Sequence, residues 1–174
     1  IEAVDLPDKF DEMLQSWDLS FKDTKTSDFV AGGVFGRIGA RKFLMDYYKE
    51  RADINKTLRA IRDFSEKWPR TFAKLVEDKA NGPAVIALLT GEISGLIAVN
   101  PEGGKISRAY AASPTVEAHN VFLPHPLIAA WVEEFIKNCA AFPNVAFDDD
   151  VDMFTQAVIK MQQPPEEKKV ARVR

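Results

Sequence analysis

The strongest constraint on the fold of this chain is an acidic run, Asp148-Asp149-Asp150-Val151-Asp152, at the start of a helical stretch that continues to Met161. Four carboxylates within five residues repel one another, so a folded protein keeps them together at a solvated surface or around a compensating cation. One aspartate is enough to cap a helix and to interact with its dipole. Four exceed that need, and the run therefore favours metal binding.

Two isolated acids follow apolar runs that are typical of strands. Asp18 comes after Ser16-Trp17, and Glu77 comes after Leu75-Val76. Together with the acidic run, they give three acidic sites, each at the end of a regular element. Such an arrangement suits a two-metal centre that cleaves phosphodiesters.

The hydrophobic pattern predicts alternating strands and helices. Ile54, Leu58, Ile61 and Phe64 keep helical spacing, and Pro69 ends that helix. Gly32-Gly33 reads as punctuation between extended segments. The predicted strands span residues 13–18, 29–38, 42–48, 73–77, 96–99 and 121–123, and the predicted helices span residues 54–68, 84–90, 106–112, 127–142 and 149–161.

This order predicts one α/β domain with a mixed central sheet of about five or more strands flanked by helices. A chain of 174 residues is long enough for one such domain with a substantial core. With acids at the ends of the first and fourth strands and on the last helix, the order resembles the RNase H-like nuclease fold. We expect residues 1–163 to form the domain and residues 164–174 to form a mobile charged tail.

The net charge of −3 argues against a nucleic-acid partner until its distribution is considered. Residues 1–28 hold eight acids and three bases, whereas residues 37–74 hold eleven bases and five acids. A carboxylate-lined metal site makes a nuclease acidic on average while a separate basic surface holds phosphates. The alternative for most of these bases is the solvated face of a helix.

Several other site types are excluded by the sequence. There is no G-x-x-x-x-G-K-[ST] loop, no G-x-S-x-G elbow and no Cys/His cluster with zinc spacing. Met153 and Ile159 stand where an EF-hand loop needs glycine and glutamate, and the single Cys139 excludes a disulfide framework. Without a membrane-spanning run or a signal peptide, we expect no membrane partner and a cytoplasmic location.

Four groups of motifs carry a resemblance to a known family, and they occur in the family's order. They are Ser16-Trp17-Asp18 with Asp23-Thr24 and Ser27-Asp28; Val76 to Gly82; Lys105-Ile106-Ser107-Arg108-Ala109 with Ser113-Pro114; and Phe142-Pro143 before the acidic run. From about residue 14 to residue 161, the chain resembles the C-terminal nuclease domain of the large terminase subunit of tailed phages and prophages.

The resemblance implies an RNase H-like endonuclease that cuts concatemeric double-stranded DNA into genome units in the host cytoplasm. In this family, the nuclease domain is joined to an N-terminal packaging ATPase. Its implied partners are double-stranded DNA, that ATPase domain, the small terminase subunit and the portal. Because the chain has no P-loop, the resemblance covers the nuclease domain alone.

The resemblance also implies the catalytic residues, which are Asp18, Glu77 and Asp149. With Asp148 and Asp152 as further candidate ligands, they would hold two Mg²⁺ or Mn²⁺ ions. The family often has an amide at the position of Asp150 and a histidine or glycine at the position of Phe147. Which aspartate of the run is the third ligand therefore stays open.

Lys105 and Arg108 match a basic motif of the family, which implies contacts with the DNA backbone. Their alternative is a solvent-facing pair three residues apart on a helix. Two alternatives also remain for the whole domain. One is another RNase H-like enzyme, such as an integrase, resolvase or exonuclease, and the other is a non-catalytic module whose acids bind a structural cation or a basic partner.

Overall fold

The computed structural model describes residues 7, 9–19, 29–79 and 81–164. In this part of the chain, six strands form one mixed sheet in the order β5-β4-β1-β2-β3-β6, and five helices pack around it. The strands are β1 Glu12–Asp18, β2 Phe29–Ile38, β3 Arg41–Arg51, β4 Ala73–Glu77, β5 Leu96–Val99 and β6 Val121–Phe122. The helices are α1 Ile54–Lys67, α2 Gly82–Leu89, α3 Lys105–Glu117, α4 Trp131–Ala141 and α5 Asp149–Lys160. The predicted α/β fold with a mixed sheet is confirmed.

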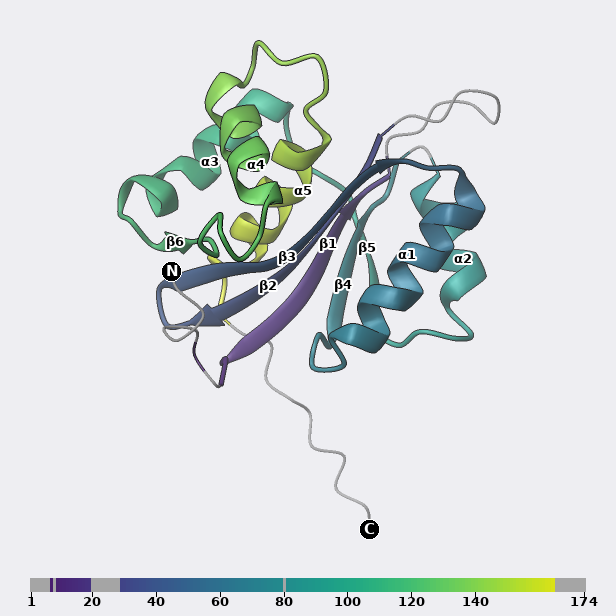
Figure 1. Ribbon diagram of the computed structural model, residues 1–174. Coiled ribbons are helices and arrows are strands. Elements are labelled where there is room, and N and C mark those ends of the chain that lie inside the picture. Colours follow the sequence, from purple (N-terminus) through teal and green to yellow (C-terminus); the bar gives the residue numbers. More distant parts are fainter. Residues whose placement is uncertain (1–6, 8, 20–28, 80, 165–174) are drawn as a thin grey trace.

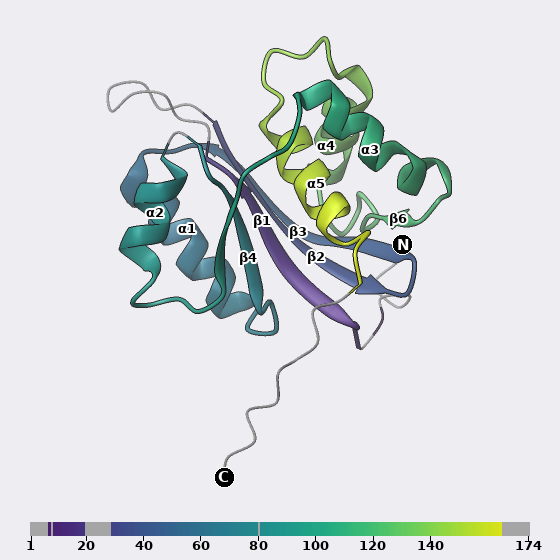
Figure 2. The same cartoon turned by 180° about the vertical axis from the view of Figure 1, so that it is seen from behind.

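The sheet lies between two helical layers. Helices α1 and α2 cover one face, and α3, α4 and α5 cover the other (Figure 1). The view from behind shows the same two layers and the strongly twisted sheet between them (Figure 2). β1, β2 and β3 form an antiparallel meander, whereas β4 is parallel to β1 and β5 is parallel to β4.

Each face of the sheet has its own hydrophobic core, because successive side chains of a strand point to opposite faces. In β1, Leu14 packs in the core beneath α5, whereas Trp17 packs beneath α1. In β4, Leu75 belongs to the α5 side and Val76 to the α1 side. The strand residues therefore alternate between two separate cores.

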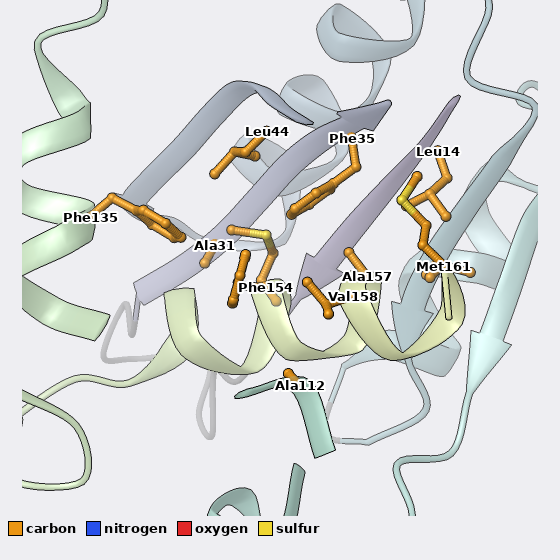
Figure 3. Packing of buried hydrophobic residues seen from close by; sticks show 12 residues of the cluster. Leu14, Ala31, Phe35, Leu44, Ala112, Phe135, Phe154, Ala157, Val158 and Met161 are labelled. Atoms are coloured by element: carbon orange, nitrogen blue, oxygen red, sulfur yellow. The ribbon is translucent and has the colours of Figure 1, made fainter. Parts of the chain in front are cut away.

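Helix α5 is buried on most of its surface. Phe154, Ala157 and Val158 face Leu14 and Phe35 of the sheet (Figure 3). Phe135 of α4 and Ala112 of α3 also belong to this core (Figure 3). Helix α3 contacts α5 on the side away from the sheet (Figure 3). This sandwiched position fixes where the acidic start of α5 lies.

The Gly32-Gly33 pair is part of β2 and not a break between strands. A Cβ atom on Gly32 would overlap the ring of Trp17, and one on Gly33 would lie 2.7 Å from the sulfur of Met153 on α5. A larger residue at position 32 would therefore displace the Trp17 ring, and a larger residue at position 33 would push α5 away from the sheet. Beside this contact, the Ser16 hydroxyl donates to the Met153 carbonyl over 2.8 Å, which ties β1 to α5.

Two predicted helix boundaries, the end of α3 and the start of α4, differ from the structure by more than two residues. α3 runs through Pro114, because the carbonyl of Tyr110, which cannot receive a bond from the proline nitrogen, accepts the Ser113 hydroxyl at 3.2 Å. α4 begins at Trp131 and not at Leu127. Leu127 is 92% exposed and does not take part in the buried face of the helix.

Candidate active site

The two isolated acids come together at the carboxyl ends of two neighbouring strands in the middle of the sheet. β1 and β4 are parallel neighbours with Trp17 opposite Val76, so Asp18 and Glu77 follow side by side. Because side chains alternate along a strand, Asp18 points to the same face as Leu14, and Glu77 points to the same face as Leu75. That face is covered by α5. Asp18 is 2% exposed and Glu77 is 9% exposed.

The start of α5 faces these strand ends across a cavity of about 550 Å³. The cavity lining includes every residue predicted for the site from the sequence: Asp18, Glu77, Lys105, Arg108, Asp148, Asp149 and Asp152. Asp150 is not among the lining residues. The structure therefore brings the three predicted acidic sites to one place, although they are far apart in the sequence.

Bases from α3 hold part of the acidic run. The Lys105 ammonium lies 2.5 Å from a carboxylate oxygen of Asp148 and 2.8 Å from one of Asp152. The Arg108 guanidinium lies 2.5 Å from the other oxygen of Asp152. Arg108 is 7% exposed, so the alternative of a solvent-facing pair is wrong for this residue. The side chain of Lys105 is 45% exposed.

Asp150 is completely buried in a network that sequence reasoning missed. Its carboxylate accepts hydrogen bonds from Lys49 at 3.0 Å, from Asn138 at 2.8 Å and from the Tyr47 hydroxyl at 3.2 Å. These donors come from β3 and α4, so Asp150 ties the start of α5 to both elements. Lys49 belongs to the base-rich stretch seen in the sequence, but nothing in that stretch singled it out.

Burial is the main cause that raises the pKa of Asp149 above its ordinary value. Nearby Asp148 raises this pKa further, whereas the backbone hydrogen bond of Asp149 and the charges of Lys49 and Lys105 lower it. Burial also disfavours the charge on Lys105, but hydrogen bonds and attraction from Asp148 and Asp152 outweigh it and raise the pKa of Lys105.

The donor set fits a hard divalent cation, because Mg²⁺ and Mn²⁺ prefer carboxylate oxygens. As the side chains stand, no group of three or more His, Cys, Asp or Glu among the described residues is arranged to hold a metal ion. Side-chain cations engage several of these acids, including Lys79, which lies 3.2 Å from Glu77. The roles of Asp18, Glu77 and Asp149 as ligands thus stay predictions.

Some sequence features lie beyond what the structure describes. The Asp23-Thr24 and Ser27-Asp28 motifs fall outside the described residues, and so does the expected tail of residues 164–174 except for residue 164. Within the described ranges, no helix is long and apolar enough to cross a membrane.

Comparison with known proteins gives both a family and a set of similar folds. The family described as Terminase RNaseH-like domain matches residues 15–161. No curated protein is similar enough in sequence to count as a match.

Three solved structures illustrate the similarity of fold. A large terminase from a thermophilic bacteriophage has a TM-score of 0.70 at 12% identity, over 91% of this chain and 41% of that one. The nuclease domain of the large terminase from bacteriophage SPP1, solved with bound Mn, has a TM-score of 0.54 at 16% identity, over 75% and 70% of the two chains. The fowlpox virus Holliday junction resolvase has a TM-score of 0.52 at 14% identity, over 86% and 97%.

The chain thus spans about two fifths of the thermophilic phage protein, and at these identities the structures establish the fold alone. The family match covers nearly the whole described domain, and it agrees with the motifs and with the element order. The chain belongs to the terminase RNase H-like domain family.

Proposed function

We propose that this domain is a metal-dependent DNA endonuclease, the nuclease part of a phage DNA-packaging terminase that cuts concatemeric double-stranded DNA. The observation that carries the proposal is the single cavity shared by Asp18, Glu77 and Asp149 in a member of this family. Two bound Mg²⁺ or Mn²⁺ ions would supply the chemistry, activating a water and stabilising the leaving 3′-oxygen.

The residues divide the work between binding and positioning. Asp18, Glu77 and Asp149 are the proposed metal ligands, with Asp148 and Asp152 as further candidates. Arg108 is buried against Asp152 and positions that carboxylate. The Lys105 ammonium is the proposed contact with a DNA phosphate at the cavity. The side chain of Lys105 is half-exposed, whereas the side chain of Arg108 is buried.

The larger assembly also belongs to this proposal. The large terminase of the thermophilic phage is more than twice the length covered here, and its structures with ADP and with ATP-gamma-S fit an ATPase on the same polypeptide. A packaging ATPase domain, the small terminase subunit and the portal are the proposed partners in the host cytoplasm. DNA recognition would be directed mainly at phosphates, with little base readout.

Nicking of supercoiled plasmid at low salt with Mn²⁺ tests the proposal. We expect open-circular and then linear DNA, complete inhibition by EDTA and recovery when excess Mn²⁺ is added. Calorimetric titration with Mn²⁺ is the matched binding measurement. Mn²⁺ binding without any cleavage would contradict the endonuclease and favour a non-catalytic cation-binding module.

A branched-DNA nuclease is the second candidate, because the similarity extends over 97% of the fowlpox virus resolvase chain. A related structure shows that resolvase with Holliday junction DNA. Parallel assays on linear duplex, nicked duplex, four-way junction and RNA–DNA hybrid separate the candidates. A terminase nuclease should cut linear duplex at least as fast as the junction.

A further inference from the structure

An aromatic group stands at the rim of the candidate active site, beside the acids. Phe29 at the start of β2 and Phe147 before α5 both line the cavity. Their rings meet edge to face with centroids 4.7 Å apart. The Arg51 guanidinium lies 4.6 Å from the Phe29 ring centroid and 5.3 Å from that of Phe147. We name Phe29, Arg51 and Phe147 the aromatic lip.

The sheet register sets the lip beside the acidic residues. Asp18, the last residue of β1, pairs with Ala31 of β2, and Phe29 lies two residues beyond Ala31, past the end of β1. Arg51 is directly opposite Phe29 in the β2–β3 pair. Phe29 and Arg51 therefore point to the same face of the sheet as Ala31, which packs beneath α5. This is the face that carries Asp18.

Two features of the lip distinguish it from core packing. Phe147 remains 45% exposed although it contacts two partners, and Arg51 is exposed at the end of β3. An edge-to-face partner and a cation over the ring fix the orientation of Phe147 and leave ring surface open. Such a preorganised π surface beside a guanidinium matches an anionic chain that carries flat aromatic groups.

We propose that the aromatic lip is a stacking site for an unpaired nucleobase of the DNA strand that enters the cavity. The inference rests on the proposed nuclease function, because it places DNA at this cavity. A base inside a duplex has both faces covered, so Phe147 would bind DNA that is frayed, nicked or single-stranded beside the cleavage point. Arg51 would hold the phosphate backbone next to the stacked base.

Base stacking is separable from charge by comparing two strands of equal length. We would measure binding of the chain to a labelled oligothymidylate and to the same strand with abasic residues, by fluorescence anisotropy in Ca²⁺ at low salt. Stacking of one base predicts roughly tenfold tighter binding of the oligothymidylate by the wild-type protein. Phe147→Leu should remove this preference, whereas Phe147→Tyr should keep it.

Phe72→Leu is the matched control, because Phe72 is 65% exposed and precedes β4 at the opposite end from Glu77. It should leave the preference unchanged. A wild-type protein without the preference, or a Phe147→Leu variant that retains it and melts normally, would overturn the inference. Plasmid nicking with Mn²⁺ is measured separately. Cleavage without a base preference would refute only the stacking role of the aromatic lip. A base preference without cleavage would refute only the proposed nuclease function.

Discussion

The cavity has a strand wall, which carries Asp18 and Glu77, and a helix wall, which carries Asp148, Asp149 and Asp152. The strand wall is positioned by backbone pairing between β1 and β4, so its two acids are neighbours whatever their charge. The helix wall depends on side chains, because Lys105, Arg108 and Lys49 hold three of the four aspartates at the start of α5.

This difference assigns distinct tasks to acids that are adjacent in sequence. Asp150 and Asp152 are almost fully buried against cations, and they anchor α5 to β3, α4 and α3. Asp149 lines the cavity and has a raised pKa, chiefly because it is buried. The helix wall therefore combines anchoring residues with Asp149, the proposed metal ligand, whereas both acids of the strand wall are proposed ligands.

The largest expected effect concerns the strand wall. Asp18→Asn and Glu77→Gln should each reduce plasmid nicking with Mn²⁺ by about a thousandfold or more, because each removes a carboxylate from the proposed two-metal site, whose metal ions would contribute several kcal/mol. Thermal unfolding should show stability unchanged or raised in Asp18→Asn, since a like charge is removed. Glu92→Gln, an exposed acid paired with Arg62, is the control and should cleave normally. A large loss of melting temperature in Asp18→Asn would mark Asp18 as a structural residue.

The next effect concerns the anchor of the helix wall. Asp150→Asn should lower the free energy of unfolding by about 3 kcal/mol or more, because Lys49 would remain buried without its counter-ion. Urea denaturation measures the change. The double variant Asp150→Asn with Lys49→Met should recover part of the loss, since it removes the stranded charge. Wild-type stability in the single variant would show that the pair is not an anchor.

A smaller effect separates the two bases of α3. Arg108→Ala should cost about 1–3 kcal/mol of stability, because the buried carboxylate of Asp152 loses a charged partner. Lys105→Ala should cost less than about 1 kcal/mol, since its side chain is half-exposed. In DNA binding the order reverses: Lys105→Ala should lower the salt slope of log affinity by roughly one unit, and Arg108→Ala should leave it unchanged. A wild-type salt slope in the Lys105→Ala variant would remove Lys105 from the DNA contacts.

The smallest effect is a pH dependence of the helix wall. The pKa of Asp149 is raised in the folded protein, so the protonated form stabilises the fold at acid pH, and this contribution is lost as pH rises through the folded pKa. Asp149→Asn should therefore match the wild type in melting temperature below about pH 3.8, the ordinary value for aspartate, and gain on it toward neutral pH. A difference that does not vary between acid and neutral pH would contradict this account.

The two acids of the strand wall could be predicted from sequence because each one follows a short apolar run, whereas the β1–β4 pairing that places them side by side is not local. Asp18 and Glu77 each end a short apolar strand, and parallel neighbours bring such ends to one edge of a sheet. The fold class followed from the same alternation of strands and helices. The order β5-β4-β1-β2-β3-β6 was not predicted, since pairing between distant strands leaves no mark in the local pattern.

The helix wall could be predicted only in part. The acidic run pointed to a site, but the partners that separate Asp150 from Asp149 come from β3 and α4, far away in sequence. Lys105 and Arg108 were expected to contact DNA, and their pairing with the acidic run became visible only in the folded chain. Side-chain neutralisation of this kind depends on three-dimensional packing, which neither composition nor spacing encodes.

The central claim is that the strand wall and the helix wall hold the same divalent cations. Anomalous diffraction from crystals soaked in Mn²⁺ tests it directly. We expect Mn²⁺ peaks in the cavity with carboxylate oxygens of Asp18, Glu77 and Asp149 at about 2.0–2.2 Å. Mn²⁺ bound outside the cavity, or held by the helix wall with Asp18 and Glu77 turned away from it, would contradict the account.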